Sequence, residues 1–179
     1  LMELVTEPVI HDAATAGRFA RELQLLLRTL GASEAHLEKG EMRIEANISV
    51  SKTDTFGTKV EVKNLNSFKS VERAIAYEIE RQSSLLEKGE AFRQETRGWD
   101  ETKGTTFHQR FKEGSADYRY FPEPDLPKIL LSELPEFSAT TLVAELPELP
   151  EQKRNRFTTL GMKADDVEFF LQNDSHRTF

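Results

Sequence analysis

Residues 57–68 read GTKVEVKNLNSF and contain a strand, a polar turn and the start of a helix. Val60 and Val62 alternate with charged residues, and a period of two predicts a half-buried strand. Asn66 or Ser67 then caps a helix, because short polar side chains accept hydrogen bonds from the free N–H groups of a first turn. This stretch therefore predicts the junction between a sheet and the helix that packs on it.

Upstream of this junction, residues 42–50 also alternate apolar and polar side chains, which predicts a second strand. Residues 51–57 between the two strands are polar and carry a turn signal, so we expect an antiparallel hairpin. Further upstream, Asp12 can cap a helix that runs to about Leu30, and Gly31 follows as a stop.

Downstream, the helix that starts at Asn66 or Ser67 continues until Gly89. Its predicted apolar stripe consists of Phe68, Val71, Ile75, Ile79 and Leu86. A second hairpin follows, with arms at 92–99 and 105–111 joined by a turn at 100–104.

The C-terminal part has a different character. Two prolines in residues 118–125 predict an extended segment. Residues 132–151 are rich in Glu and lack Lys and Arg, which indicates a boundary region with short helical pieces. Pro150 suits the first turn of a helix through Leu160, and residues 165–172 predict another helix.

The order helix, hairpin, helix, hairpin predicts an α+β fold with an antiparallel sheet and packed helices. We expect residues 1–130 to form the C-terminal part of one domain, and residues 131–179 to form a linker and the start of a helical domain. The chain opens inside an apolar run at Leu1, which predicts that further residues precede it in the complete protein.

Composition narrows the classes of function. The chain has 179 residues, a hydrophobic fraction of 37% and no cysteine, so disulfides, thiolate metal sites and a cysteine nucleophile are excluded. No apolar run is long enough to predict a transmembrane helix, and no association with a membrane is expected. The net charge of −7 argues against nucleic-acid binding through overall charge and leaves room only for a local basic patch.

The polar cluster at the strand–helix junction admits two interpretations. Lys63, with the amides of Asn64 and Asn66 and the hydroxyl of Ser67, can bind an anion or phosphate beside helical N–H groups. The alternative is a helix cap with an exposed lysine, which local features favour.

Two arginines are further candidates. Arg97, in the segment 94–97, either contacts a phosphate or carboxylate or forms a surface ion pair of small value. Arg119 lies in residues 117–125, where interleaved aromatic and charged side chains can hold a substrate. A proline-rigid turn packed by its own rings explains this segment equally well.

Glu3 and Glu45 are the candidate metal ligands, because Mg²⁺ favours carboxylate oxygens together with nucleotide phosphates. The alternative for Glu3 is the polar side of an edge strand. The histidines show no metal-ligand spacing, so His108 is interpreted as a surface or cap residue.

Five segments together resemble the B-subunit family of the aspartyl/glutamyl-tRNA amidotransferases. Their order and spacing match the family, strongly over 1–127 and more weakly over 128–179. The segments are residues 3–8 (ELVTEP), 42–49 (MRIEANIS), 57–68 (GTKVEVKNLNSF), 94–97 (QETR) and 117–125 (DYRYFPEPD).

The resemblance implies a cradle-type catalytic domain followed by helical domains that hold tRNA. It implies an enzyme in which ATP, with Mg²⁺, activates the side-chain carboxylate of Glu-tRNA(Gln) or Asp-tRNA(Asn) as an acyl phosphate. Ammonia that the amidase subunit (the A component of a heterotrimer) releases from glutamine then displaces the phosphate, and the C component ties the other two together. The resemblance fits a bacterial cytoplasm or an organellar matrix and does not fix which misacylated tRNA is the substrate.

Carried over to this sequence, the resemblance implies roles for eight residues. The implied assignments are Lys63, Arg97 and Arg119 as catalytic residues, Asn64, Asn66 and Ser67 as ATP contacts, and Glu3 and Glu45 at the metal.

The sequence also departs from the family. Ile44 and Glu45 stand where the family usually has Cys-Asp. A family segment with a Glu-x-His metal motif precedes the position of Leu1, so we expect this chain alone to be inactive. The alternative function is a non-catalytic RNA-binding or assembly module that kept the fold. Convergence of Glu3, Lys63 and Arg97 on one cavity would favour the enzyme.

Overall fold

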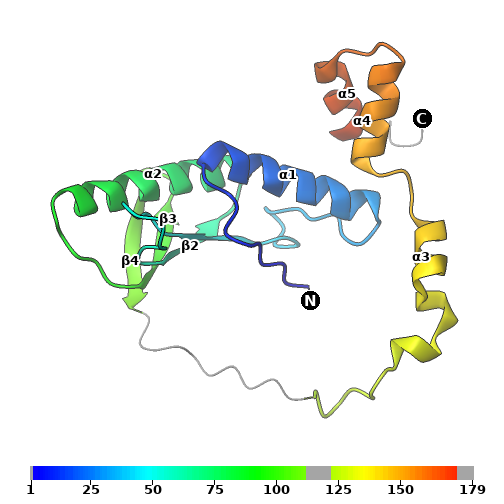
Figure 1. Cartoon of the computed structure of the whole chain (residues 1–179), viewed down its shortest axis with the longest axis horizontal. Coiled ribbons are helices and arrows are strands. Elements are labelled where there is room, and N and C mark those ends of the chain that lie inside the picture. Colours follow the sequence, from blue (N-terminus) through cyan, green and yellow to red (C-terminus); the bar gives the residue numbers. More distant parts are fainter. Residues whose placement is uncertain (1, 112–121, 173–179) are drawn as a thin grey trace. The chain divides into compact units, whose positions relative to one another are not determined.

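The computed structural model of the chain describes residues 2–111 and 122–172 (Figure 1). The chain divides into two compact units. The first unit comprises Leu1–Gln24 and Glu34–Gly114, and the second comprises Leu25–Ser33 and Ser115–Phe179. The expected domain division at 130/131 stays a prediction about the whole protein.

The first unit contains a four-stranded sheet in the order β1-β2-β3-β4. The strands are β1 (Ile44–Ile48), β2 (Val60–Leu65), β3 (Glu95–Asp100) and β4 (Thr105–Phe111). Both predicted hairpins are present as antiparallel pairs, and the α+β class is confirmed.

The expectation of a fully antiparallel sheet is wrong for the central pair, because β2 and β3 run parallel. A helix connects these two strands and returns the chain to the end of the sheet where β2 began. Such a crossover connection makes neighbouring strands parallel, so the sheet is mixed.

Both long helices lie where the sequence predicts them, as α1 (Ala13–Thr29) and α2 (Phe68–Glu87). Asp12 accepts a hydrogen bond of 2.7 Å from the Thr15 N–H, and Ser67 accepts one of 3.0 Å from the Ser70 N–H. These side chains satisfy donors that a helix start leaves without intrahelical partners. The predicted caps are therefore confirmed.

Helix α2 packs along one face of the sheet, here called the covered face (Figure 1). The buried core between them consists of Ile48, Val60, Val62, Leu65, Val71, Ala74 and Trp99. Trp99 is the single tryptophan of the chain and is 2% exposed. Because side chains alternate along a strand, the residues between these core positions point to the opposite face, here called the far face.

A β-bulge interrupts the alternation at the end of β2. Between Ile44 and Ala46 of β1 the register slips by one residue, so that β2 accommodates an extra residue. Asn64 has a φ of 66°, in the left-handed region that asparagine tolerates better than most residues. The bulge returns Leu65 to the core, at 3% exposure, just before helix α2 begins.

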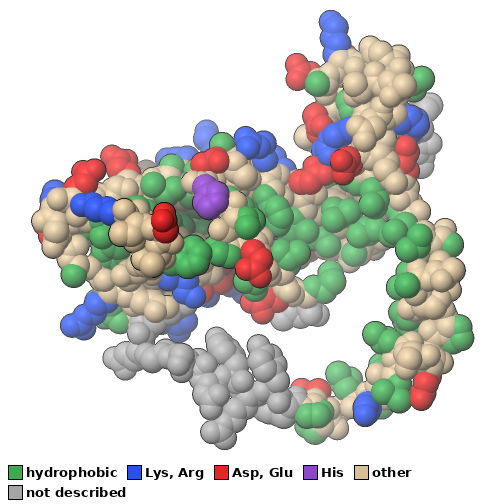
Figure 2. Space-filling model, in the orientation of Figure 1, with side chains coloured by type: hydrophobic (Ala, Val, Ile, Leu, Met, Phe, Trp, Pro, Cys, Tyr) green, Lys and Arg blue, Asp and Glu red, His purple; other side chains and the backbone are tan. Residues whose placement is uncertain are grey.

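The second unit is helical, and its predicted helices are confirmed. Its elements between residues 122 and 172 are η1 (Leu131–Glu133), η2 (Pro135–Phe137), α3 (Ala139–Glu145), α4 (Pro150–Thr159) and α5 (Ala164–Gln172). Leu25, Val167 and Leu171 form a small core there. The short elements η1, η2 and α3 bury no residue, and Figure 2 shows hydrophobic side chains along them.

None of the helices that the structure describes combines the length and the hydropathy that a transmembrane span needs.

Candidate functional site

The predicted site residues do not converge on one place. Lys63 lies on the far face of the sheet, beside carboxylates of β1 and β2. Arg97 lies on the covered face, beneath α2 and beside Glu78 of that helix. The two strands are neighbours, with Val62 opposite Arg97, so the two cationic side chains are separated by the sheet itself.

The far-face cluster consists of Glu45, Glu61, Lys63 and Thr96. The Lys63 ammonium lies 3.0 and 3.1 Å from the two carboxylate oxygens of Glu45 and 3.8 Å from Glu61. Thr96 donates a hydrogen bond of 2.9 Å to the Glu61 carboxylate. The Lys63 side chain remains 29% exposed and that of Glu45 33%, so a ligand in solvent can reach both.

The predicted ATP contacts all have local partners at the bulge. The Asn64 side chain donates a hydrogen bond of 3.0 Å to the carbonyl of Trp99, and the Asn66 side chain donates one of 3.1 Å to the Asn64 side chain. Ser67 caps α2 and also shares a 2.7 Å hydrogen bond with the Ser70 hydroxyl. The cap interpretation is confirmed for Ser67. A contact of these three residues with ATP stays a prediction.

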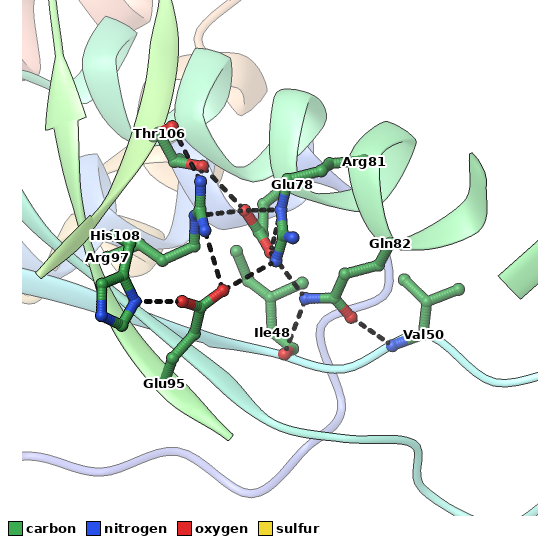
Figure 3. Close-up of polar contacts among 9 residues, drawn as sticks. All are labelled: Ile48, Val50, Glu78, Arg81, Gln82, Glu95, Arg97, Thr106 and His108. Carbon is green, nitrogen blue, oxygen red and sulfur yellow. Dashed lines mark hydrogen bonds and ion pairs between the residues drawn. The ribbon is translucent and has the colours of Figure 1, made fainter. Parts of the chain in front are cut away.

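A second group of polar side chains is buried under α2 and is here called the buried network (Figure 3). Its members are Glu78, Arg81, Gln82, Glu95, Arg97 and Thr106, with His108 at its edge, where 41% of the His108 side chain is exposed. Glu78 is fully buried, and its carboxylate accepts hydrogen bonds from Arg81, Gln82 and Thr106. A buried carboxylate is costly unless it is paired and hydrogen-bonded, and this network supplies both.

Arg97 is held on three sides within the buried network. It donates three hydrogen bonds: one of 2.8 Å to Glu95, one of 2.8 Å to the Thr106 hydroxyl and one of 3.0 Å to the Thr106 carbonyl. Its Nε lies 3.7 Å from a carboxylate oxygen of Glu78, and its side chain is only 13% exposed. Arg97 therefore links β3, β4 and α2, which makes it more than the surface ion pair that was the alternative interpretation.

Glu95 is the second carboxylate of the buried network. Burial by itself would raise its pKa, but hydrogen bonds from His108 and Arg97, with the charges of Arg97 and Arg81, outweigh burial and lower the pKa. The His108 Nδ1 lies 2.5 Å from the Glu95 carboxylate. Glu95 therefore stays ionised at neutral pH, and His108 has a defined partner.

Gln82 connects the buried network to the end of β1. Its side-chain amide nitrogen donates a hydrogen bond of 3.3 Å to the carbonyl of Ile48, and its side-chain oxygen accepts one of 3.0 Å from the N–H of Val50. Neither Glu78 nor Gln82 was predicted from the sequence. The available signal was their spacing, since both continue the buried helical face that Ala74 begins, at intervals of four residues.

The two predicted metal ligands do not form a magnesium site by themselves. Glu3 is exposed on a segment without helix or strand, so its placement on an edge strand is not observed. Glu45 is paired with Lys63. Over residues 2–111 and 122–172, no three Asp, Glu or His side chains are grouped closely enough to hold a metal ion. Arg119 lies outside the described residues.

Comparison with known proteins identifies the family. The sequence profile of the GatB/GatE catalytic domain matches residues 1–135. The chain is 48% identical over 177 residues to the B subunit of the chloroplastic/mitochondrial glutamyl-tRNA(Gln) amidotransferase of Physcomitrium patens, covering 98% of this chain and 31% of that protein. It is 46% identical over 180 residues to the B subunit of the aspartyl/glutamyl-tRNA(Asn/Gln) amidotransferase of Thermus thermophilus, covering 100% and 38%.

A third relative, the B subunit of the aspartyl/glutamyl-tRNA(Asn/Gln) amidotransferase of Gloeothece citriformis, is 48% identical over 93% of this chain and 34% of its own length. The chain thus spans about a third of the length of the curated relatives that it matches. The matched profile covers most of the sequence, and the identity extends along all of it. The chain belongs to the GatB/GatE catalytic domain family.

Proposed function

We propose that the whole protein is one component of a tRNA-dependent amidotransferase that converts Glu-tRNA(Gln) or Asp-tRNA(Asn) to Gln-tRNA(Gln) or Asn-tRNA(Asn). The observation that carries this proposal is the identity of nearly half of all residues, along the entire chain, with proteins named for this activity. The proposed location is a bacterial cytoplasm or an organellar matrix, because the relatives include bacterial and chloroplastic/mitochondrial proteins.

The proposed chemistry has two steps. The side-chain carboxylate of the misacylated tRNA attacks the γ-phosphorus of ATP, which gives an acyl phosphate and ADP. Ammonia then attacks the carbonyl carbon, phosphate leaves, and the amide nitrogen loses a proton. We propose glutamine as the ammonia source, hydrolysed by the amidase subunit, with the C component joining the assembly. We propose Mg²⁺ as the companion of ATP, where it would neutralise charge on the phosphates.

The far-face cluster supports a role for Lys63 at the phosphates. Phosphoryl transfer depends mainly on positioning and on neutralising charge, and an exposed ammonium can exchange the Glu45 carboxylate for a phosphate oxygen. Lys63 directly precedes the bulge residue Asn64, and bulges are frequent beside active sites, where they re-aim side chains. Glu45 and Glu3 remain proposed metal ligands, to be completed by residues outside the described chain.

Arg97 receives a different role in this proposal. Its donors already hold Glu95 and Thr106 under α2, so a direct phosphate contact would require the buried network to break. We therefore assign Arg97 to positioning: it fixes β3 and β4 against α2, the helix that begins five residues after Lys63.

A second candidate is a non-catalytic RNA-binding or assembly module. The observation that favours it is the location of Lys63 and Arg97 on opposite faces of the sheet, since the two do not share a cavity. If Arg97 has a positioning role, its place on the covered face does not argue against an enzyme. Only the far-face residues then need to lie together at one site.

The test is ATP-dependent formation of Gln-tRNA(Gln) from Glu-tRNA(Gln) by the full-length protein assembled with its partner subunits. Wild type is compared with Glu3→Gln and with Glu90→Gln, which changes an exposed glutamate before β3. We expect an active wild type, an active control and loss of activity in an assembled Glu3→Gln variant. A fully active Glu3→Gln variant removes Glu3 from the site. A wild type that is inactive with both misacylated tRNAs supports the non-catalytic module.

A further inference from the structure

The loop between β1 and β2 exposes an aromatic ring. Phe56 is 77% exposed, the largest exposed fraction of any phenylalanine that the structure describes. A single exposed hydrophobic residue is common and needs no explanation by itself. Phe56, however, belongs to a loop that is held in a defined conformation. This loop, residues 50–57, is here called the Phe56 loop, and its anchoring needs an explanation.

The Phe56 loop is fixed at both ends. At its start, the Val50 N–H donates a hydrogen bond of 3.0 Å to Gln82 of the buried network. Lys52 donates a hydrogen bond of 2.8 Å to the carbonyl of Leu86, in the last turn of α2, where a cation also interacts favourably with the helix dipole. At its end, Gly57 lies so close to the carbonyl oxygen of Val50 that a Cβ atom there would collide with it.

Hydroxyl groups order the loop between these anchors. Ser51 and Thr53 share a hydrogen bond of 3.1 Å, and Thr53 and Thr55 share one of 2.8 Å. The backbone N–H of Thr53 also donates 3.1 Å to the Ser51 hydroxyl. The loop therefore holds its own shape and presents Phe56 to solvent, instead of folding the ring back onto the sheet.

A cation follows the ring three residues later, just before β2 begins. Lys59 is exposed and, within the described residues, no ion pair engages it. Glu61 and Lys63 lie on the far face, and Lys59, directly before β2, has the same parity in the alternation as these two residues. Four residues of extended chain span about 13 Å, so Lys59 and the loop that carries the ring adjoin the end of β2 opposite to Lys63.

We propose that the Phe56 loop is a stacking platform for an unpaired base at the 3′ end of the tRNA, with Lys59 contacting the adjoining phosphate. Exposed aromatic rings that stack on bases, together with cations that contact the backbone, are the means by which proteins bind single-stranded nucleic acid, and Phe56 and Lys59 supply one of each within four residues. The 3′ end is the unpaired part of the tRNA that must reach the aminoacyl chemistry. The inference rests on the proposed function and adds to it the residues that guide the substrate toward Lys63.

The experiment uses the full-length protein assembled with its partner subunits and a fluorescently labelled tRNA(Gln). Phe56→Ala is expected to weaken tRNA binding about 5- to 150-fold, the range for loss of one stacked base. Phe56→Trp is expected to restore binding, because tryptophan stacks at least as well. Lys59→Gln is expected to reduce the slope of log affinity against log salt by about one, whereas Phe56→Ala leaves that slope unchanged.

Phe169→Ala is the matched control, since Phe169 is 61% exposed in the second unit. Wild-type affinity in Phe56→Ala, or Phe56→Trp binding as weakly as Phe56→Ala, overturns the inference. Failure of Phe56→Ala to assemble with the partner subunits, with unchanged tRNA affinity, also overturns it, because the ring then contacts protein.

The two proposals fail separately. An active wild type whose KM for misacylated tRNA is unchanged by Phe56→Ala contradicts the stacking platform and leaves the proposed function intact. An inactive wild type whose tRNA affinity still depends on Phe56 supports the platform and contradicts the enzyme.

Discussion

The two faces of the sheet use charge in different ways. On the covered face, Glu78 and Glu95 are buried; Arg97, 13% exposed, donates a hydrogen bond of 2.8 Å to Glu95 and forms an ion pair of 3.7 Å with Glu78. On the far face, Lys63 and Glu45 form a pair that solvent reaches, with about a third of each side chain exposed. The same residue types therefore serve the fold on one face and remain available to a ligand on the other.

The energetics of the two faces explain this division. Breaking a buried ion pair leaves an uncompensated charge and costs about 3–5 kcal/mol, whereas an exposed pair is worth about 0–1 kcal/mol. A ligand can replace a partner only where the exchange is inexpensive. Lys63 can release Glu45 to meet a phosphate, but Arg97 cannot leave Glu95 without disturbing the attachment of α2.

The largest expected effect is on the covered face. Glu78→Leu should lower the free energy of unfolding by about 3–5 kcal/mol, because Arg81 and Arg97 lose a buried counter-charge. Urea unfolding followed by the fluorescence of Trp99 measures this. The control is Glu80→Leu, at an exposed position of the same helix. Equal costs for the two variants would contradict the importance of the buried network.

The second effect depends on pH. The pKa of Glu95 lies below its ordinary value of 4.5, so the folded state favours the ionised carboxylate. This contribution to stability is complete above the pKa of the unfolded chain and is lost as pH falls through the lower pKa of the folded state. Between pH 7 and pH 3 the wild type should therefore lose more stability than Glu95→Gln, measured by urea unfolding at each pH. Parallel pH profiles for the two proteins would refute the contribution of Glu95.

A smaller effect is expected at the start of α2, between the two faces. Ser67→Ala should cost about 1 kcal/mol of stability, since it removes the acceptor of the Ser70 N–H. The control Ser83→Ala, inside the same helix, should cost less because alanine favours helix interiors. Thermal unfolding of both variants decides this, and a larger loss for Ser83→Ala would count against the cap.

The smallest expected effect on stability is on the far face. Lys63→Met removes a solvent-accessible pair with Glu45 and a longer pair with Glu61, and should change the free energy of unfolding by less than about 1 kcal/mol. Urea unfolding under the conditions used for Glu78→Leu tests the comparison directly. A cost similar to that of Glu78→Leu would mean that both faces serve the fold equally.

Much of the fold was predictable because its signals are local. The alternation at Val60 and Val62, the caps at Asp12 and Ser67 and the stop at Gly89 each depend on neighbouring residues alone. The pairing of β2 with β3 was not predictable in this way. A strand pattern identifies a strand but not its partner, and the parallel pairing depends on the path of the crossover through α2.

The site was predictable only in part. Lys63 and Glu45 were both predicted as site residues, and those roles stay predictions; their contact across the hairpin follows from the register of β1 and β2. The role of Arg97 depended on Glu78, which was overlooked because the predicted apolar stripe of α2 followed Ile75 and Ile79. Those two residues are only partly buried, whereas Glu78 and Gln82 on the adjacent stripe are fully buried.

The most direct test of the difference between the faces is the rate of ATP-dependent amidation of Glu-tRNA(Gln) by assembled, full-length Lys63→Met. We predict a loss of about 100-fold or more in rate, as for removal of one group that stabilises transition-state charge, with urea unfolding close to wild type. A Lys63→Met enzyme with the wild-type rate would contradict this and would leave the far-face cluster without a part in the chemistry.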